Sequence, residues 1–192
     1  MQQTFLDGIA LHKLFTGGYR NLKQNMEAIN DLNVFPVPDG DTGTNMVQTF
    51  GGGLRSVAPD TKSASVYMQR LARAVLLSAR GNSGVIFSQF IHGLARGFEG
   101  KQTVVFSDFA YAFRCAREDS YKAIITPTEG TILTLIREAA EFLATDEARC
   151  AELLPGFQKL LQHMKKTLSK TPELLPVLKE AGVVARCFAF IR

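Results

Sequence analysis

The sequence predicts an all-α fold in which seven or eight antiparallel helices form one domain. Apolar residues recur at helical spacing along almost the whole chain. Short linkers that carry Gly, Pro or Asp separate these stretches, as is typical of antiparallel neighbours in helical bundles. Strand signals are scarce: only residues 103–106 are rich in β-branched side chains, and the sequence offers them no partner strand.

The predicted helices follow one another in order. The first carries an apolar stripe from Phe5 to Ile29, and Gly17-Gly18 marks the place where it could bend or divide. The second begins near Thr42 and ends before a linker at 51–62 that opens with three glycines. Further repeats of apolar residues predict helices over 65–78, 82–98, 107–125, 128–143 and 147–168, and a short last element over 172–178.

Composition excludes several classes of protein. The 192 residues suit a single domain, 1–192, and 46% hydrophobic with 21% charged residues is an ordinary globular composition. The net charge of +4 forms no basic tail, and basic residues do not alternate with aromatic ones, which argues against nucleic-acid binding. The three cysteines form no CxxC pair, so neither a disulfide framework nor a zinc site is predicted. No apolar run suits a signal peptide or a membrane span, so we expect a cytoplasmic protein.

The stretch NVFPVPDGDTGTNM, at 33–46, predicts a metal site next to a helix start. Pro36 and Pro38 restrict the backbone before Asp39 and Asp41, and Gly40 between the two acids permits a turn. Two carboxylates two residues apart suit Mg²⁺, which is commonly held by one or two carboxylates together with substrate phosphates. The helix that follows begins with unpaired backbone N–H groups that favour an anion. The alternative is that one acid only caps this helix and the rest forms a turn.

A second loop, SARGNSG at 78–84, lies between two strongly helical stretches. Asn82 or Ser83 is a candidate cap for the next helix, and Gly81 and Gly84 permit close approach of the backbone. Small polar residues at a helix start are typical of phosphate-binding loops, although the Gly-Lys-Ser/Thr of a Walker A loop is absent. The alternative is an ordinary capped junction between two helices.

A third loop, TPTEGT at 126–131, has the same character. Thr128 is the candidate cap, which would place Thr131 at the third helical position with its hydroxyl available. Gly130 would then lie in the first turn at a cost of about 1 kcal/mol relative to alanine. A costly glycine at a helix start favours a ligand lying against it. Three such helix starts, one with paired acids, together predict a shared site for a nucleotide and a metal ion.

These three stretches, in this order, resemble the DhaL-like (DAK2) nucleotide-binding domain of dihydroxyacetone kinases and of the bacterial fatty acid kinase subunit. The resemblance covers residues 5 to about 184 and implies an antiparallel up-and-down barrel of about eight helices with ATP or ADP and two Mg²⁺ ions at one rim. The implied metal ligands are Asp39, Asp41 and, in place of an upstream acid, Asn33. The implied nucleotide-binding residues are Thr42, Gly43, Thr44, Asn45, Asn82, Ser83, Gly84, Thr128, Gly130 and Thr131.

The resemblance is strongest to the fatty acid kinase branch, because Thr42 stands where the dihydroxyacetone branch more often has histidine. It implies the ATP·Mg²⁺-binding part of a kinase that phosphorylates a fatty acid held by a separate carrier protein and is inactive alone. No catalytic residue is predicted on this chain. A dihydroxyacetone kinase subunit and a non-catalytic nucleotide-binding module that regulates a partner are the two alternatives. A homodimer is compatible with all three.

The end of the chain departs from the resembling family. The fatty acid kinase subunit has further domains, and the family usually continues with an Asp-Ser-Gly-Gly run where this chain ends AGVVARCFAFIR. We therefore expect an atypical, truncated or frameshifted end over about 185–192.

Overall fold

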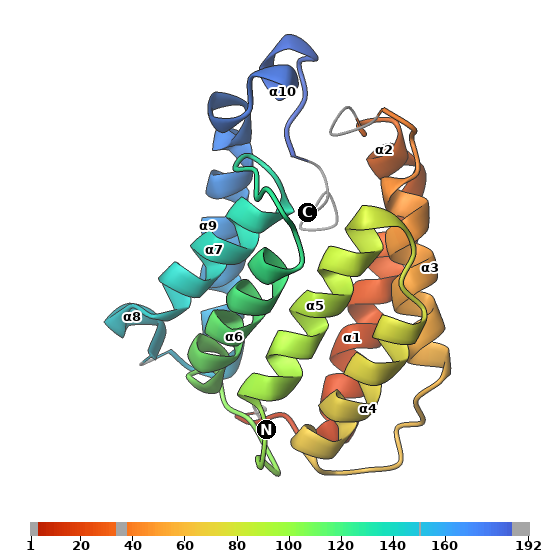
Figure 1. The fold of residues 1–192 in the computed structure, drawn as a ribbon. Coiled ribbons are helices and arrows are strands. Elements are labelled where there is room, and N and C mark those ends of the chain that lie inside the picture. Colours follow the sequence, from red (N-terminus) through yellow and green to blue (C-terminus); the bar gives the residue numbers. More distant parts are fainter. Residues whose placement is uncertain (1–3, 34–37, 150, 186–192) are drawn as a thin grey trace.

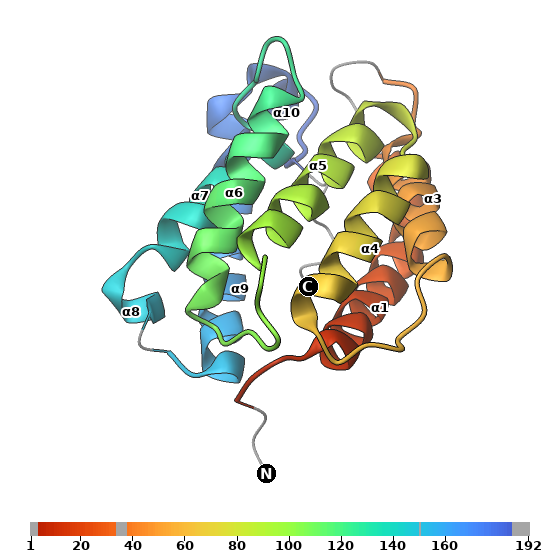
Figure 2. The same cartoon turned by 60° about the horizontal axis from the view of Figure 1, so that its bottom comes forward.

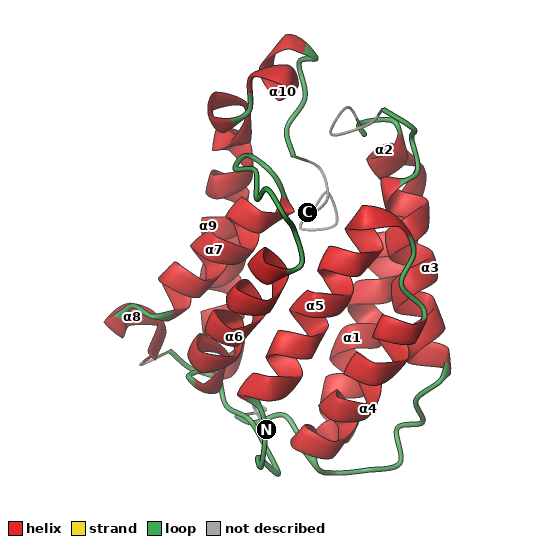
Figure 3. Cartoon of the chain, in the orientation of Figure 1, coloured by secondary structure: helices red, strands yellow, loops and turns green. Residues whose placement is uncertain are grey.

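The computed structural model describes residues 4–33, 38–149 and 151–185, and helices make up most of this part of the chain (Figures 1 and 3). The all-α prediction is confirmed, since no strand is present among the residues described. The closure of the helices into a barrel stays a prediction. The helices are α1 (Gly8–Gln24), α2 (Met26–Asn30), α3 (Thr42–Arg55), α4 (Ala64–Leu77), α5 (Gly81–Gly97), α6 (Asp108–Lys122), α7 (Ile132–Leu143), α8 (Asp146–Arg149), α9 (Leu153–Leu174) and α10 (Pro176–Glu180).

The long helices pack mainly against their neighbours in sequence. α1 lies against α3 and α4, α3 also contacts α5, and the series continues from α4 through α5, α6 and α7 to α9 (Figures 1 and 2). Their apolar faces form one core that extends from α1 to α9. A separate small cluster of Leu175, Leu178 and Ala185 joins the end of α9 to α10 and the segment after it.

The three consecutive glycines at 51–53 lie inside α3, so the prediction that a linker begins there is wrong. Each glycine faces a different close neighbour. A Cβ on Gly51 would lie 2.7 Å from the Tyr19 hydroxyl oxygen, and one on Gly53 would lie 2.3 Å from Val75 Cγ2. Glycine weakens a helix, but here it lets α3 approach α1 and α4 more closely than any side chain would allow.

Helix α9 continues through Pro172, although the sequence predicts that this helix ends at 168 and that a separate element begins at 172. A proline inside a helix leaves the carbonyl four residues earlier without its N–H partner. That carbonyl belongs to Leu168, and the Thr171 hydroxyl donates to it at 2.8 Å. The same hydroxyl oxygen accepts a hydrogen bond from the backbone N–H of Ala185 at 2.9 Å. Thr171 therefore satisfies the freed carbonyl and ties the returning chain to α9.

Two further expectations change in detail. Residues 103–106 do have a partner, because the backbones of Leu6 and Val104 exchange two hydrogen bonds of 2.8 Å in an isolated antiparallel bridge. The first predicted helix is divided at Asn25 rather than at Gly17-Gly18, which lie within α1 with no neighbour near the position of a Cβ.

Two predictions lie outside the described residues: the restriction imposed by Pro36 and the character of the chain end over 186–192. Among the helices that the structure describes, none is long and apolar enough to cross a membrane.

Candidate functional site

The two acids of the first loop stand immediately before α3. Gly40 between them has a φ of 66°, a conformation that glycine adopts readily and other residues rarely. Asp41 is the N-cap residue of α3, but its side chain caps no backbone N–H group in the described structure. Asp39 is exposed, and its Oδ1 accepts a hydrogen bond of 2.6 Å from Asn33 Nδ2. Asn33 and Asp39 are therefore in contact, and Asp41 follows two residues after Asp39 at the start of α3.

The first turn of α3 is capped from another helix by Asn30, which the sequence analysis missed. Asn30 Oδ1 accepts a hydrogen bond of 3.1 Å from the Thr44 N–H, and Asn30 Nδ2 donates to Thr44 Oγ1 at 2.9 Å. A Cβ on Gly43 would lie 2.3 Å from the Met26 carbonyl oxygen, so the turn sits close against α2. Because Asn30 takes the Thr44 N–H, the N–H groups of Thr42 and Gly43 are the ones left for an anion.

The start of α5 lies directly beside α3. Thr49 Oγ1 accepts a hydrogen bond of 3.0 Å from the Arg80 N–H, and a Cβ on Gly84 would lie 2.4 Å from the same oxygen. Gly81 has a φ of 58°, and its Cβ position is 2.3 Å from Asn45 Nδ2. A methyl group at Gly84 would therefore press on Thr49, whereas Gly81 is exposed and has a backbone conformation that other residues rarely adopt.

The cap predicted for α5 is wrong. The helix begins at Gly81, and Arg80 occupies the N-cap position without a side-chain capping bond. Asn82 and Ser83 lie within the first turn, Asn82 exposed and Ser83 half-buried. Within the part of the chain that the structure describes, neither side chain caps the helix, so both are candidates to meet a ligand at this end of it.

The cap predicted for α7 is also wrong. Thr131, and not Thr128, is the N-cap residue, and its hydroxyl oxygen accepts from the Leu133 N–H at 3.3 Å. The Thr131 hydroxyl also donates to the Thr128 carbonyl at 2.7 Å, so it is not left available. Gly130 precedes the helix with a φ of 80° instead of lying in its first turn. This positive φ, rather than a ligand, is sufficient reason for glycine at this position.

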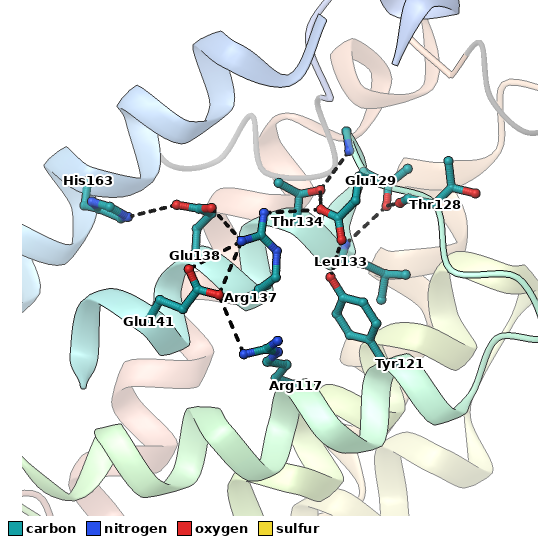
Figure 4. Close-up of polar contacts among 12 residues, drawn as sticks. Arg117, Tyr121, Thr128, Glu129, Leu133, Thr134, Arg137, Glu138, Glu141 and His163 are labelled. Atoms are coloured by element: carbon teal, nitrogen blue, oxygen red, sulfur yellow. Dashed lines mark hydrogen bonds and ion pairs between the residues drawn. The ribbon is translucent and has the colours of Figure 1, made fainter. Parts of the chain in front are cut away.

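Glu129, beside this cap, is the acceptor for several side chains of α6 and α7 (Figure 4). Burial acts to raise the pKa of Glu129, but hydrogen bonds from Thr134 and Tyr121 and the charge of Arg137 outweigh it, so the pKa is lowered overall. Burial and the hydrogen bond to Glu129 raise the pKa of Tyr121 to about 12. At neutral pH Glu129 is therefore a carboxylate and Tyr121 a hydrogen-bond donor.

The three predicted loops lie at the same end of the helices (Figures 1 and 2). The first two are joined directly, through Asn45 at Gly81 and through Thr49 at Arg80. The third packs on α9, because the Cβ position of Gly130 faces Leu175 and Thr171. Sequence spacing could indicate each loop, but it gives no signal for partners such as Asn30 and Thr49 on other helices.

The oxygen ligands at the start of α3 fit Mg²⁺ held mainly by phosphates. Within the described ranges no group of three or more His, Cys, Asp and Glu side chains could enclose a metal ion. Asp39 and Asp41 supply two carboxylates beside backbone N–H groups that favour an anion. Mg²⁺ is usually bound by one or two carboxylates with phosphate oxygens and water, so two acids are enough.

Comparison with known proteins identifies the family of the chain. The DAK2 domain family matches residues 36–187. The chain is 42% identical over 183 residues to protein YloV of Bacillus subtilis. The aligned region covers 93% of this chain and 32% of that protein. It is 39% identical to an uncharacterized Staphylococcus saprophyticus protein, over 93% of this chain and 33% of that protein. It is 41% identical to an uncharacterized Mycoplasma pneumoniae protein, over 87% of this chain and 31% of that protein. The chain spans about a third of the length of these relatives, and it belongs to the DAK2 domain family.

Proposed function

We propose that this chain is the ATP·Mg²⁺-binding domain of a phosphotransferase. One observation carries the proposal: the start of α5 packs against the first half of α3 through Thr49 and the glycines at 81 and 84, and two acids lead into α3. Such an arrangement directs the positive ends of two helix dipoles toward one region. A polyphosphate with its metal ions matches that pattern of charge.

Different residues are candidates for binding the phosphates and the metal ion. The N–H groups of Thr42 and Gly43 and the side chains of Asn82 and Ser83 are the candidates for phosphate oxygens, because no capping interaction uses them in the described structure. Asp39 and Asp41 would hold Mg²⁺, which when bound neutralises the charge of the phosphates. This division requires no general base on the chain, because positioning and charge neutralisation provide most of the catalysis in phosphoryl transfer.

We further propose that the acceptor is a fatty acid presented by a separate carrier protein. The support is the resemblance of the three loops to the fatty acid kinase branch, including Thr42 in place of histidine. Phosphoryl transfer requires donor and acceptor to be held in line. The candidate binding groups of the three loops are polar or charged and suit a nucleotide, so the chain alone is expected to bind ATP without phosphorylating free fatty acid.

Isothermal titration calorimetry with ATP, with and without Mg²⁺, tests the binding. Asp41→Asn is expected to abolish the Mg²⁺-dependent part of the affinity, because it removes half of the fixed negative charge facing the metal. Asp60→Asn is the control: Asp60 is also an acid in a loop, but it is exposed, and its ion-pair partner among the described residues is Arg70 on the surface. Equal Mg²⁺-dependent affinity of the Asp41→Asn and Asp60→Asn variants would falsify the site.

Release of ADP tests the acceptor. The chain is incubated with ATP and Mg²⁺ and with dihydroxyacetone, with free fatty acid, or with fatty acid and a fatty-acid-binding carrier. The proposal predicts turnover only with the carrier. Turnover with dihydroxyacetone would move the chain to the sugar-kinase branch, and tight ATP binding with no turnover in any mixture would support a regulatory module.

A further inference from the structure

Glu129 connects the loop before α7 to two helices through one carboxylate. Its Oε1 accepts a hydrogen bond of 2.8 Å from the hydroxyl of Tyr121, which lies on α6. Its Oε2 accepts a hydrogen bond of 2.5 Å from Thr134 Oγ1, on α7, and lies 3.4 Å from Arg137 Nη2 (Figure 4). Both oxygens are thus used, and the two shortest contacts come from neutral hydroxyl groups.

The Thr134 hydroxyl carries the effect of Glu129 to the backbone. Thr134 is buried, and its Oγ1 donates to Glu129 while it accepts from the Gly130 N–H at 2.7 Å. On the opposite side, the Cβ position of Gly130 lies 3.1 Å from the Thr171 carbonyl oxygen and 2.5 Å from Leu175 Cβ. The backbone at Gly130 is therefore held between α7 and α9, in a positive-φ conformation that directly precedes the cap at Thr131.

The ion pair with Arg137 does not explain why a glutamate is needed here. Arg137 Nη1 lies 2.9 Å from Glu138 Oε1 and 3.3 Å from Glu141 Oε1, so two other carboxylates already balance the charge of Arg137 (Figure 4). Its contact with Glu129 is the longest of the three. What Glu129 alone provides is an acceptor for Tyr121 and Thr134 together, and an ionised carboxylate has only acceptors.

We infer that Glu129 is a positioning residue for nucleotide binding: through Thr134 it fixes Gly130 and Thr131 without touching the nucleotide itself. The inference rests on the proposed function, because it assumes that the third loop faces the same ligand as the first two. The role that we assign to the Glu129 carboxylate is to hold Gly130 in its left-handed conformation. The helix cap at Thr131 does not do this.

The experiment compares Glu129→Gln with Glu141→Gln in the whole chain. Both variants remove one carboxylate from Arg137, but only the first leaves Tyr121 and Thr134 with a single acceptor oxygen in place of two, because a glutamine amide has one oxygen and one NH2 donor. Amide hydrogen exchange measured by NMR without nucleotide should speed up at Gly130 in Glu129→Gln alone. Calorimetry should show ATP affinity reduced about five- to tenfold in Glu129→Gln, the effect of about one hydrogen bond, with no change in Glu141→Gln.

Thr134 provides an independent pair of variants if Glu129→Gln folds poorly. Thr134→Ser keeps the hydroxyl and should behave as the parent does, whereas Thr134→Val keeps the shape and should reproduce the loss. Parent-like exchange at Gly130 in both Glu129→Gln and Thr134→Val overturns the positioning role. Faster exchange with unchanged ATP affinity overturns the link to the nucleotide while the proposed function stands. Absence of ATP binding in the parent chain refutes the proposed function and that link together.

Discussion

Replacing Gly84 by alanine perturbs the contact that holds the first turn of α5 against the middle of α3. The new Cβ would lie 2.4 Å from Thr49 Oγ1, well inside the roughly 3.3 Å of a close carbon–oxygen contact. Thr49 is fully buried and accepts the Arg80 N–H at 3.0 Å, so it cannot turn aside without losing that bond. Either the hydrogen bond breaks or α5 moves away from α3.

The change in the free energy of unfolding has three contributions, of which two destabilise the fold and one stabilises it. Overpacking costs roughly 1–3 kcal/mol, and loss of the hydrogen bond to Arg80 costs about 1 kcal/mol. Alanine in place of glycine returns up to about 1 kcal/mol of helix propensity. We therefore expect Gly84→Ala to lower the free energy of unfolding by roughly 1–3 kcal/mol, or the melting temperature by about 2–12 °C in a chain of this size.

Urea denaturation of Gly84→Ala and Gly17→Ala measures the effect against a matched control. Gly17 is also inside a helix, but nothing lies within 4 Å of its Cβ position, so alanine there should stabilise by up to about 1 kcal/mol. Thr49→Ala in the Gly84→Ala background should recover part of the loss, because it removes the oxygen that the new methyl group meets. If Gly84→Ala is as stable as Gly17→Ala, the account of the α3–α5 contact is refuted.

Three further predictions concern stability. Asn30→Ala should destabilise by about 1 kcal/mol, the usual effect of a lost helix cap, and chemical denaturation should show no such change for Asn82→Ala, whose side chain caps nothing. Asp119→Asn should cost about 2 kcal/mol by denaturation, because Asp119 is buried and accepts from Arg96 at 2.8 Å, a charge-assisted bond. The pKa of Glu129 is lowered in the folded state, so its stabilising contribution is present above about pH 4.3 and lost as the pH falls below that value. The melting temperature of Glu129→Gln should therefore fall less than that of the parent between pH 5 and pH 3; equal falls would count against the assigned contacts.

The sequence predicts the helical class because apolar spacing is a local property, and it points to the three loops because their composition is unusual. It misassigns the glycines at 51–53, since glycine marks either a flexible linker or a close helix contact. The neighbours that decide between the two, such as Tyr19 and Val75, lie on other helices. The continuation of α9 past Pro172 depends in the same way on a single hydroxyl, that of Thr171.

The helix caps at the candidate site also depend on tertiary contacts that the local sequence does not indicate. Thr128 and Thr131 are equally good capping residues by type, and the positive φ of Gly130, held by Thr134 and by α9, decides in favour of Thr131. Asn30 caps α3 from fourteen residues away, a pairing that no local pattern indicates. Positions of loops are therefore predictable from the sequence, while the bonds that orient them depend on tertiary contacts.

The most direct test of the proposed ATP·Mg²⁺ site is a crystal structure of this chain with ATP and Mg²⁺. We predict phosphate density against the first turns of α3 and α5, next to Thr42, Gly43 and Ser83, with metal density within bonding distance of Asp39 and Asp41. Nucleotide density at the opposite end of the helices, or phosphates held without any contact to those two acids, would contradict it.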